Sequence, residues 1–131
     1  MTAPSRGTIA GLDHVQLAIP PGGEDASRSF WVGLLGLTEL PKPDLLAVRG
    51  GCWFRALDGT GAAVLDLHLG VEEPFIPARK AHPGIRVHDL DSLAALFGDA
   101  GLPVRWSDEI PGTRRFHSQD PFGNRLEFIQ A

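Results

Sequence analysis

The sequence predicts an α+β protein made of two similar modules, each with the element order strand, helix and three strands (βαβββ). Two observations support this prediction. Apolar residues change from alternating to helical spacing in the same order in each half, and a proline-containing connector, VEEPFIPARKA (71–81), separates the halves. We therefore expect a flexible N-terminal tail (1–8) and one domain (9–131), in which module one (9–71) and module two (80–131) are paired.

Module one begins with LDHVQLAI (12–19), whose alternating pattern is typical of a half-buried strand. EDASRSFWVGLLG (24–36) follows with helical spacing, and Gly36 is placed to end that helix. Three strands are then expected at LLAVRG (45–50), CWFRAL (52–57) and AVLDLHLG (63–70). The sequence DGTG (58–61) predicts a hairpin turn between the last two of them.

Module two repeats this order. HPGIRV (82–87) is expected to be a strand, and DLDSLAALFGDAG (89–101) a helix with its N-terminal cap at Asp89 or Asp91. Three further strands are expected at PVRWSDEI (103–110), TRRFHSQ (113–119) and RLEFIQ (125–130). In the turn DPFGN (120–124), Pro121 suits the first corner and Gly123 the left-handed position.

Composition excludes several classes of function. The net charge of −4, the pI near 5.6 and the lack of a basic stripe argue against a nucleic-acid partner. No apolar run is long enough to span a membrane, and MTAPSRGT (1–8) lacks the apolar segment of a secretory signal. The single cysteine, Cys52, excludes an internal disulfide, suits the cytoplasm and is expected to be a small buried side chain.

Four potential metal ligands lie at matching points of the two modules. His14 and His82 belong to the first strands, whereas His68 and Glu127 belong to the last strands. Three imidazoles and one carboxylate suit zinc, nickel, iron(II) or manganese. The repeat therefore predicts a divalent metal site, although a single histidine on a strand is more often only hydrogen-bonded or solvated.

Strand parity predicts which side chains share a face. His14, His68 and Glu127 each alternate with apolar neighbours, so all three are expected on the face opposite the helices. A three-residue loop in DPFGN would place His117 opposite Glu127 on the same face. Glu127 and His117 are therefore candidate catalytic residues for proton transfer, but a slip of one residue would turn His117 to the core.

Several of these segments resemble the vicinal oxygen chelate superfamily, the glyoxalase/bleomycin resistance protein/extradiol dioxygenase group. The resemblance covers roughly residues 9–130 and is carried by LDHVQLAI, SFWVGLLGL, LHLG, HPGIRVHDLDSL and, most specifically, DPFGNRLEF. It implies a glyoxalase-like fold of curved mixed sheets around a concave metal site. It also implies a homodimer whose sites take ligands from both chains.

The resemblance maps the metal-ligand positions of the family onto His14, His68, His82 and Glu127. It implies an enzyme of lyase or isomerase type, in which the ion chelates neighbouring oxygens of a small-molecule substrate and stabilises an oxyanion or enolate. Two alternatives stay open. One is a non-catalytic protein that binds a small molecule or an antibiotic, and the other is an iron(II) ring-cleaving dioxygenase that uses His14, His82 and Glu127.

Overall fold

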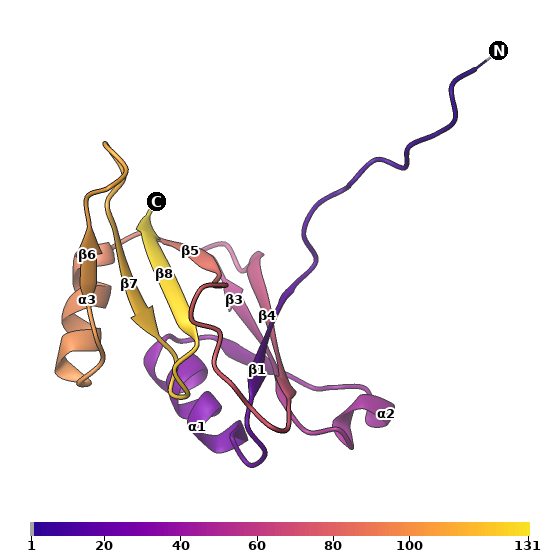
Figure 1. Ribbon diagram of the computed structural model, residues 1–131, viewed down its shortest axis with the longest axis horizontal. Helices are drawn as coiled ribbons and strands as arrows, with labels where there is room; N and C mark the ends of the chain where they lie inside the picture. The colour runs from indigo at the N-terminus through magenta and orange to yellow at the C-terminus, as the bar shows by residue number, and fades with distance from the viewer. Residues whose placement is uncertain (1) are drawn as a thin grey trace.

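The computed structural model describes residues 2–131 and contains two four-stranded mixed sheets with the same strand arrangement (Figure 1). The first sheet has the order β1-β4-β3-β2 and the second the order β5-β8-β7-β6. In each sheet the first strand runs parallel to the last, and the other pairs are antiparallel. The predicted α+β class and the duplication are confirmed. Met1, the first residue of the expected tail, lies outside the described residues.

The first sheet consists of β1 (Val15–Ile19), β2 (Thr38–Leu40), β3 (Cys52–Leu57) and β4 (Ala63–Val71). The helix expected over residues 24–36 forms as α1 (Glu24–Arg28) followed by a π-helical segment, η1 (Ser29–Leu34). Gly36 follows with a φ of +77° and ends it, as predicted.

The prediction of a strand at residues 45–50 is wrong. A short helix, α2 (Asp44–Ala47), forms there, and β2 lies earlier in the chain. Pro43 precedes the helix with a φ of −54°, Asp44 lies in its first turn, and leucine and alanine are good helix formers. Leu45 is 86% exposed, so the apolar run did not mark a buried strand.

The second sheet consists of β5 (Gly84–Val87), β6 (Arg105–Ser107), β7 (Arg115–Gln119) and β8 (Arg125–Gln130). α3 (Leu90–Asp99) lies between β5 and β6, and its cap is Asp89, whose Oδ1 accepts a hydrogen bond from the Ser92 amide at 3.1 Å. His82 lies two residues before β5 rather than in it. Among residues 2–131, no helix combines the length and apolarity needed to cross a membrane.

The turn between β7 and β8 forms as predicted and joins three parts of the chain. The Asp120 amide donates to the Asn124 carbonyl at 2.9 Å, and Gly123 has a φ of +92°. The buried Asn124 side chain accepts from the Ala78 amide at 2.9 Å and donates to the Ala18 carbonyl and to Asp120 Oδ2, both at 2.8 Å. The loop therefore connects the end of β1 to the connector and fixes where β8 begins.

One hydrophobic core is shared by both sheets and both long helical segments. Phe97 of α3 contacts Phe116 and Phe128 of the second sheet, with ring centroids 5.9 and 5.2 Å apart. It also contacts Phe30 of η1 at 5.8 Å. Since the apolar faces of both sheets contribute to this core, the opposite, polar face of each sheet points away from it.

Candidate metal centre

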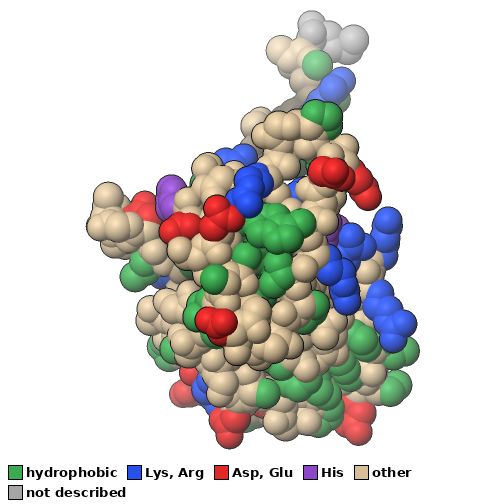
Figure 2. All heavy atoms as spheres, turned by 90° about the vertical axis from the view of Figure 1, so that its left-hand side faces the viewer, with side chains coloured by type: hydrophobic (Ala, Val, Ile, Leu, Met, Phe, Trp, Pro, Cys, Tyr) green, Lys and Arg blue, Asp and Glu red, His purple; other side chains and the backbone are tan. Residues whose placement is uncertain are grey.

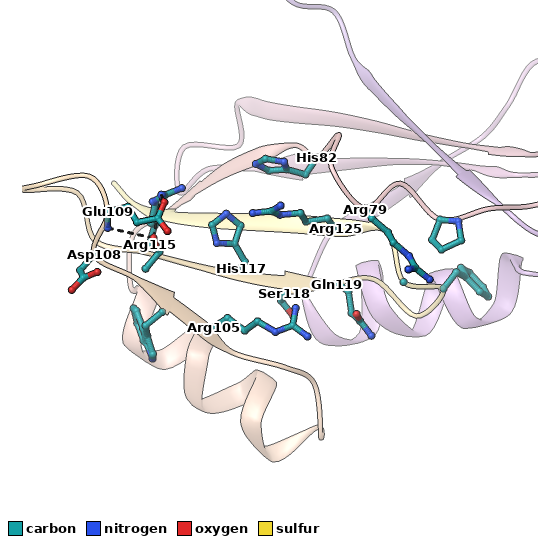
Figure 3. Close-up of a pocket in the computed structure, with 15 residues that line it drawn as sticks. Arg79, His82, Arg105, Asp108, Glu109, Arg115, His117, Ser118, Gln119 and Arg125 are labelled. Carbon is teal, nitrogen blue, oxygen red and sulfur yellow. Dashed lines mark hydrogen bonds and ion pairs between the residues drawn. The ribbon is translucent and has the colours of Figure 1, made fainter.

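Three side chains that can bind a metal meet on the polar face of the second sheet: His82, His117 and Glu127. Their ligand atoms all lie within 4.8 Å of one another, and Figure 3 shows His82 and His117 on the same side of the sheet. Glu127 lies directly opposite His117 in the β7–β8 ladder, so the register predicted from the turn is confirmed. The elements of module two therefore bring two imidazoles and one carboxylate together.

Local sequence explains how Glu127 comes to face His82. Leu126 and Phe128 are fully buried in the core, so strand alternation turns Glu127 to the polar face. The Glu127 amide donates to the Pro83 carbonyl at 3.1 Å, which holds the residue after His82 beside β8. His82 Nε2 consequently lies 3.1 Å from Glu127 Oε1.

The contact between His82 and Glu127 requires a positive charge. His82 Nδ1 lies 2.8 Å from the Lys80 carbonyl oxygen, which can only accept, so Nδ1 carries the hydrogen. In a neutral ring, Nε2 then has a lone pair that faces a carboxylate oxygen. Either a second proton or a cation must relieve this repulsion. Two ligand atoms that share one divalent ion typically lie roughly 3.0–3.4 Å apart, so the observed spacing fits a metal ion.

Arg115 fixes the other oxygen of the carboxylate. Its Nη1 donates to Glu127 Oε2 at 2.7 Å, and both side chains are only 11% exposed. Burial raises the pKa of Glu127, but the hydrogen bond from Arg115 and the contact with His82 together outweigh it, and the net effect holds the pKa below its ordinary value. Glu127 is therefore ionised at neutral pH, with Oε2 on Arg115 and Oε1 directed toward His82.

His117 completes the cluster as a neutral imidazole. Burial, and secondly the positive charge of Arg125, lower the pKa of His117 from its ordinary value. Its ring centroid lies 5.7 Å from that of His82. A neutral imidazole can bind a metal or accept a proton, so both roles expected from the sequence are chemically open to His117.

The structure places His14, one residue before β1 rather than in it, beside His68 of β4. Their rings stack with centroids 4.0 Å apart, and His68 also stacks on Trp53 at 4.2 Å. Burial, and secondly His14, lower the pKa of His68. Among residues 2–131, the three-membered cluster on the second sheet does not include them. The four predicted ligands thus form two pairs within one chain, and their meeting at one ion stays a prediction.

A cavity of about 920 Å³ opens beside the cluster. His82 and His117 line it together with four arginines: Arg79, Arg105, Arg115 and Arg125 (Figure 3). The sequence reasoning missed these arginines, although strand parity already places Arg115 beside His117 on β7 and Arg125 beside Glu127 on β8. The positive charge of the pocket could therefore be predicted once the register of β7 and β8 was known.

Cys52 has no place in this site. It is 1% exposed, and burial raises the pKa of its thiol to about 11. The expectation of a small buried side chain is confirmed.

Comparison with known proteins gives the family. The model of the Glyoxalase/Bleomycin resistance protein/Dioxygenase superfamily matches residues 11–128, so the chain belongs to that superfamily. Its members often use divalent metals, and the cluster on the second sheet is a possible metal-binding site in this chain. A comparison with curated proteins gave no match.

Solved structures support the same fold. A glyoxalase family protein from Bacillus anthracis is 40% identical with a TM-score of 0.86, and the match covers 96% of this chain and 98% of that one. An antibiotic binding protein from a Streptomyces strain is 23% identical with a TM-score of 0.65, with 94% and 98% covered. Lactoylglutathione lyase from Agrobacterium tumefaciens is 18% identical with a TM-score of 0.69, with 95% and 96% covered.

Proposed function

We propose that the protein is a metal-dependent enzyme of lyase or isomerase type that acts on a small substrate with two neighbouring oxygens. His82 and Glu127 of one chain would hold a divalent ion together with His14 and His68 of a second copy. The observation that carries this proposal is the contact between His82 Nε2 and Glu127 Oε1 at 3.1 Å, in which two lone pairs face each other unless a cation or a second proton lies between them.

The residues of the chain have separate roles in this proposal. The bound ion would supply Lewis acidity that polarises the substrate oxygens and stabilises oxyanion or enolate character. Arg115 orients Glu127 by holding Oε2, which leaves Oε1 for the ion. His117, neutral and within 4.8 Å of the other two ligand groups, accepts or returns the proton that the reaction moves.

The homodimer is part of the proposal because of where the two pairs lie. The polar faces of the two sheets point away from one shared core, so the His14–His68 pair of a chain is not directed at its own His82 cluster. A second copy could bring its first sheet against the second sheet of its partner. Each dimer would then contain two complete sites.

Metal analysis tests the proposal directly. The protein would be purified without a histidine tag, offered zinc, nickel, iron(II) or manganese, and assayed for bound metal. We expect the wild type and the control His88→Ala, which changes an exposed histidine outside the cluster, to retain the ion, and His82→Ala and Glu127→Ala to lose it. A wild-type protein that neither retains nor takes up any divalent ion would end the proposal.

Mixing two inactive variants tests whether chains share the site. One carries His14→Ala and His68→Ala, and the other carries His82→Ala and Glu127→Ala. If ligands come from both chains, refolding them together restores metal binding in mixed dimers, because one of the two sites in each then has all its ligands. Sites built within a single chain would restore nothing.

A second candidate is an iron(II) dioxygenase. The specific observation in its favour is that His82, His117 and Glu127 are two imidazoles and one carboxylate, the donor set of many iron(II) oxygenases. This candidate predicts oxygen consumption with a catechol when the protein holds iron(II) and none when it holds zinc. If instead tight ligand binding without turnover survived a chelator and His14→Ala, a purely binding function would be supported.

A further inference from the structure

The cavity beside the metal centre is surrounded by positive charge. In the β6–β7 ladder Arg105 lies directly opposite His117, and Arg125 lies on β8 two residues before Glu127. Arg79 reaches the same cavity from the connector. Figure 3 shows Arg105 and Arg125 near His117 and Arg79 farther along the cavity, and Figure 2 shows Lys and Arg side chains gathered along one edge of the molecule.

Most of this charge has no partner. Arg115 is neutralised by Glu127, but within residues 2–131 Arg79, Arg105 and Arg125 form no ion pair within 4.0 Å. The carboxylates among the lining residues are Asp108 and Glu109, and the Glu109 side chain is 84% exposed. The chain as a whole carries a net charge of −4, so the excess of positive charge is local to this cavity.

Arg105 of β6 and Arg125 of β8 flank β7 on the face that carries His117, so an anion bound between them would offset two like charges. Guanidinium groups present planar donor pairs that match the oxygens of a carboxylate or a phosphate. Phe122 also lines the cavity and offers an apolar surface to the remainder of a ligand. The combination suits a small organic anion better than a neutral or cationic molecule.

We propose that the substrate of the metal centre is an organic anion whose oxyanionic group binds Arg105 and Arg125, with Arg79 as a further contact. The inference rests on the proposed function, since it assigns the cavity beside the metal cluster to the substrate. The oxyanion can be a carboxylate or a phosphate, because both present the same oxygens to the arginines. An acidic surface of a second chain is the competing occupant.

Benzoate and benzamide form a matched pair of probes, because they share size and shape but differ in charge. Binding of each to the full-length protein would be followed by calorimetry or NMR after treatment with a chelator, so that metal coordination plays no part. We expect the wild type to bind benzoate about tenfold or more tightly than benzamide. Added salt should weaken the benzoate complex.

Three arginine variants then locate the contact. Arg105→Gln and Arg125→Gln should each weaken benzoate binding about tenfold and leave benzamide binding unchanged. Arg49→Gln, which removes the same charge from an exposed arginine outside the cavity, should bind benzoate as the wild type does. Circular dichroism of each variant shows whether it is folded.

The outcomes separate this inference from the proposed function. Equal binding of benzoate and benzamide, or equal weakening by Arg49→Gln and the two cavity variants, overturns the inference, and a cavity filled by an acidic partner surface would give that first result. Metal content is measured on the same samples. If the benzoate preference is present in a protein that takes up no metal, the proposed metal enzyme fails while anion recognition stands.

Discussion

Replacement of Glu127 by glutamine tests both the buried ion pair and the proposed metal site, because this carboxylate has a role in each. It neutralises the buried guanidinium of Arg115, and it offers its other oxygen to a cation beside His82. Glutamine keeps the size of the side chain and one oxygen acceptor but removes the charge. The two roles can then be separated by measuring stability with a chelator and with zinc.

The expected loss follows from the burial of the pair. Arg115 and Glu127 are each 11% exposed and lie 2.7 Å apart, and removing one partner of such a pair costs roughly 3–5 kcal/mol. Because glutamine can still accept a hydrogen bond, we expect about 3 kcal/mol. A domain of this length has a total stability on the order of 7–20 kcal/mol, so the variant should still fold.

Urea denaturation followed by tryptophan fluorescence measures this loss. The control is Glu39→Gln, the same chemical change in an exposed pair with Arg28, with N–O distance 2.8 Å, and it should cost about 0.5 kcal/mol. Zinc at 100 times its dissociation constant should add about 2.7 kcal/mol to the wild type and nothing to Glu127→Gln. Agreement of Glu127→Gln with the wild type within about 0.5 kcal/mol in chelator would show that the ion pair with Arg115 contributes little to stability. Equal stabilisation of both proteins by zinc would show that Glu127 does not hold the ion.

Three further predictions use the same unfolding assay. Because the pKa of Glu127 is lowered from its ordinary value of 4.5, the stability that its charge contributes is present above pH 4.5 and is lost as the pH falls through the folded-state pKa. The difference between wild type and Glu127→Gln should therefore shrink in acid, and a constant difference would contradict this. Asn124→Ala strands three hydrogen-bonding groups, one buried and two half-buried, and should cost about 3 kcal/mol or more; a loss below about 1 kcal/mol would show that water replaces them. Gly51→Ala places a methyl group against the Leu69 carbonyl at a φ of +85° and should cost about 2 kcal/mol or more, whereas Gly59→Ala, with open space around it, should cost less than half of that.

Repetition and strand parity made much of the fold predictable. The same order of spacing in the two halves gave the two modules, and the buried Leu126 and Phe128 on either side of Glu127 confirm which face the carboxylate occupies. The turn DPFGN fixed its register because glycine at position 123 supplies the left-handed conformation that a three-residue loop requires. Local sequence was sufficient to predict strand register and the facing of side chains where a tight turn joined strands of alternating apolar and polar residues.

The prediction of secondary structure failed where the sequence had neither a clear turn nor an alternating pattern. The run at 45–50 is apolar but lacks alternation between buried and exposed positions, and Pro43 starts a helix there instead. The arrangement of His14 and His68 relative to His82 could not be obtained from spacing at all. It depends on which faces of the two sheets pack together, and that is decided by long-range contacts such as Phe30 with Phe97.

The charges around the cluster connect the proposed chemistry to the proposed substrate. When His82 and His117 are neutral ligands of a bound ion, Glu127 carries the one negative charge of the three clustered groups and Arg115 offsets it, so these groups together with Arg115 have no net charge. A divalent ion bound there would therefore keep its full positive field, to which Arg105 and Arg125 add. Such a site favours an anionic substrate in the ground state and stabilises further negative charge as the reaction proceeds. Arg115→Met would remove this offset, so we expect tighter retention of the ion together with weaker activation of the substrate. Looser retention of the ion would show that Arg115 acts mainly by holding Glu127 in position.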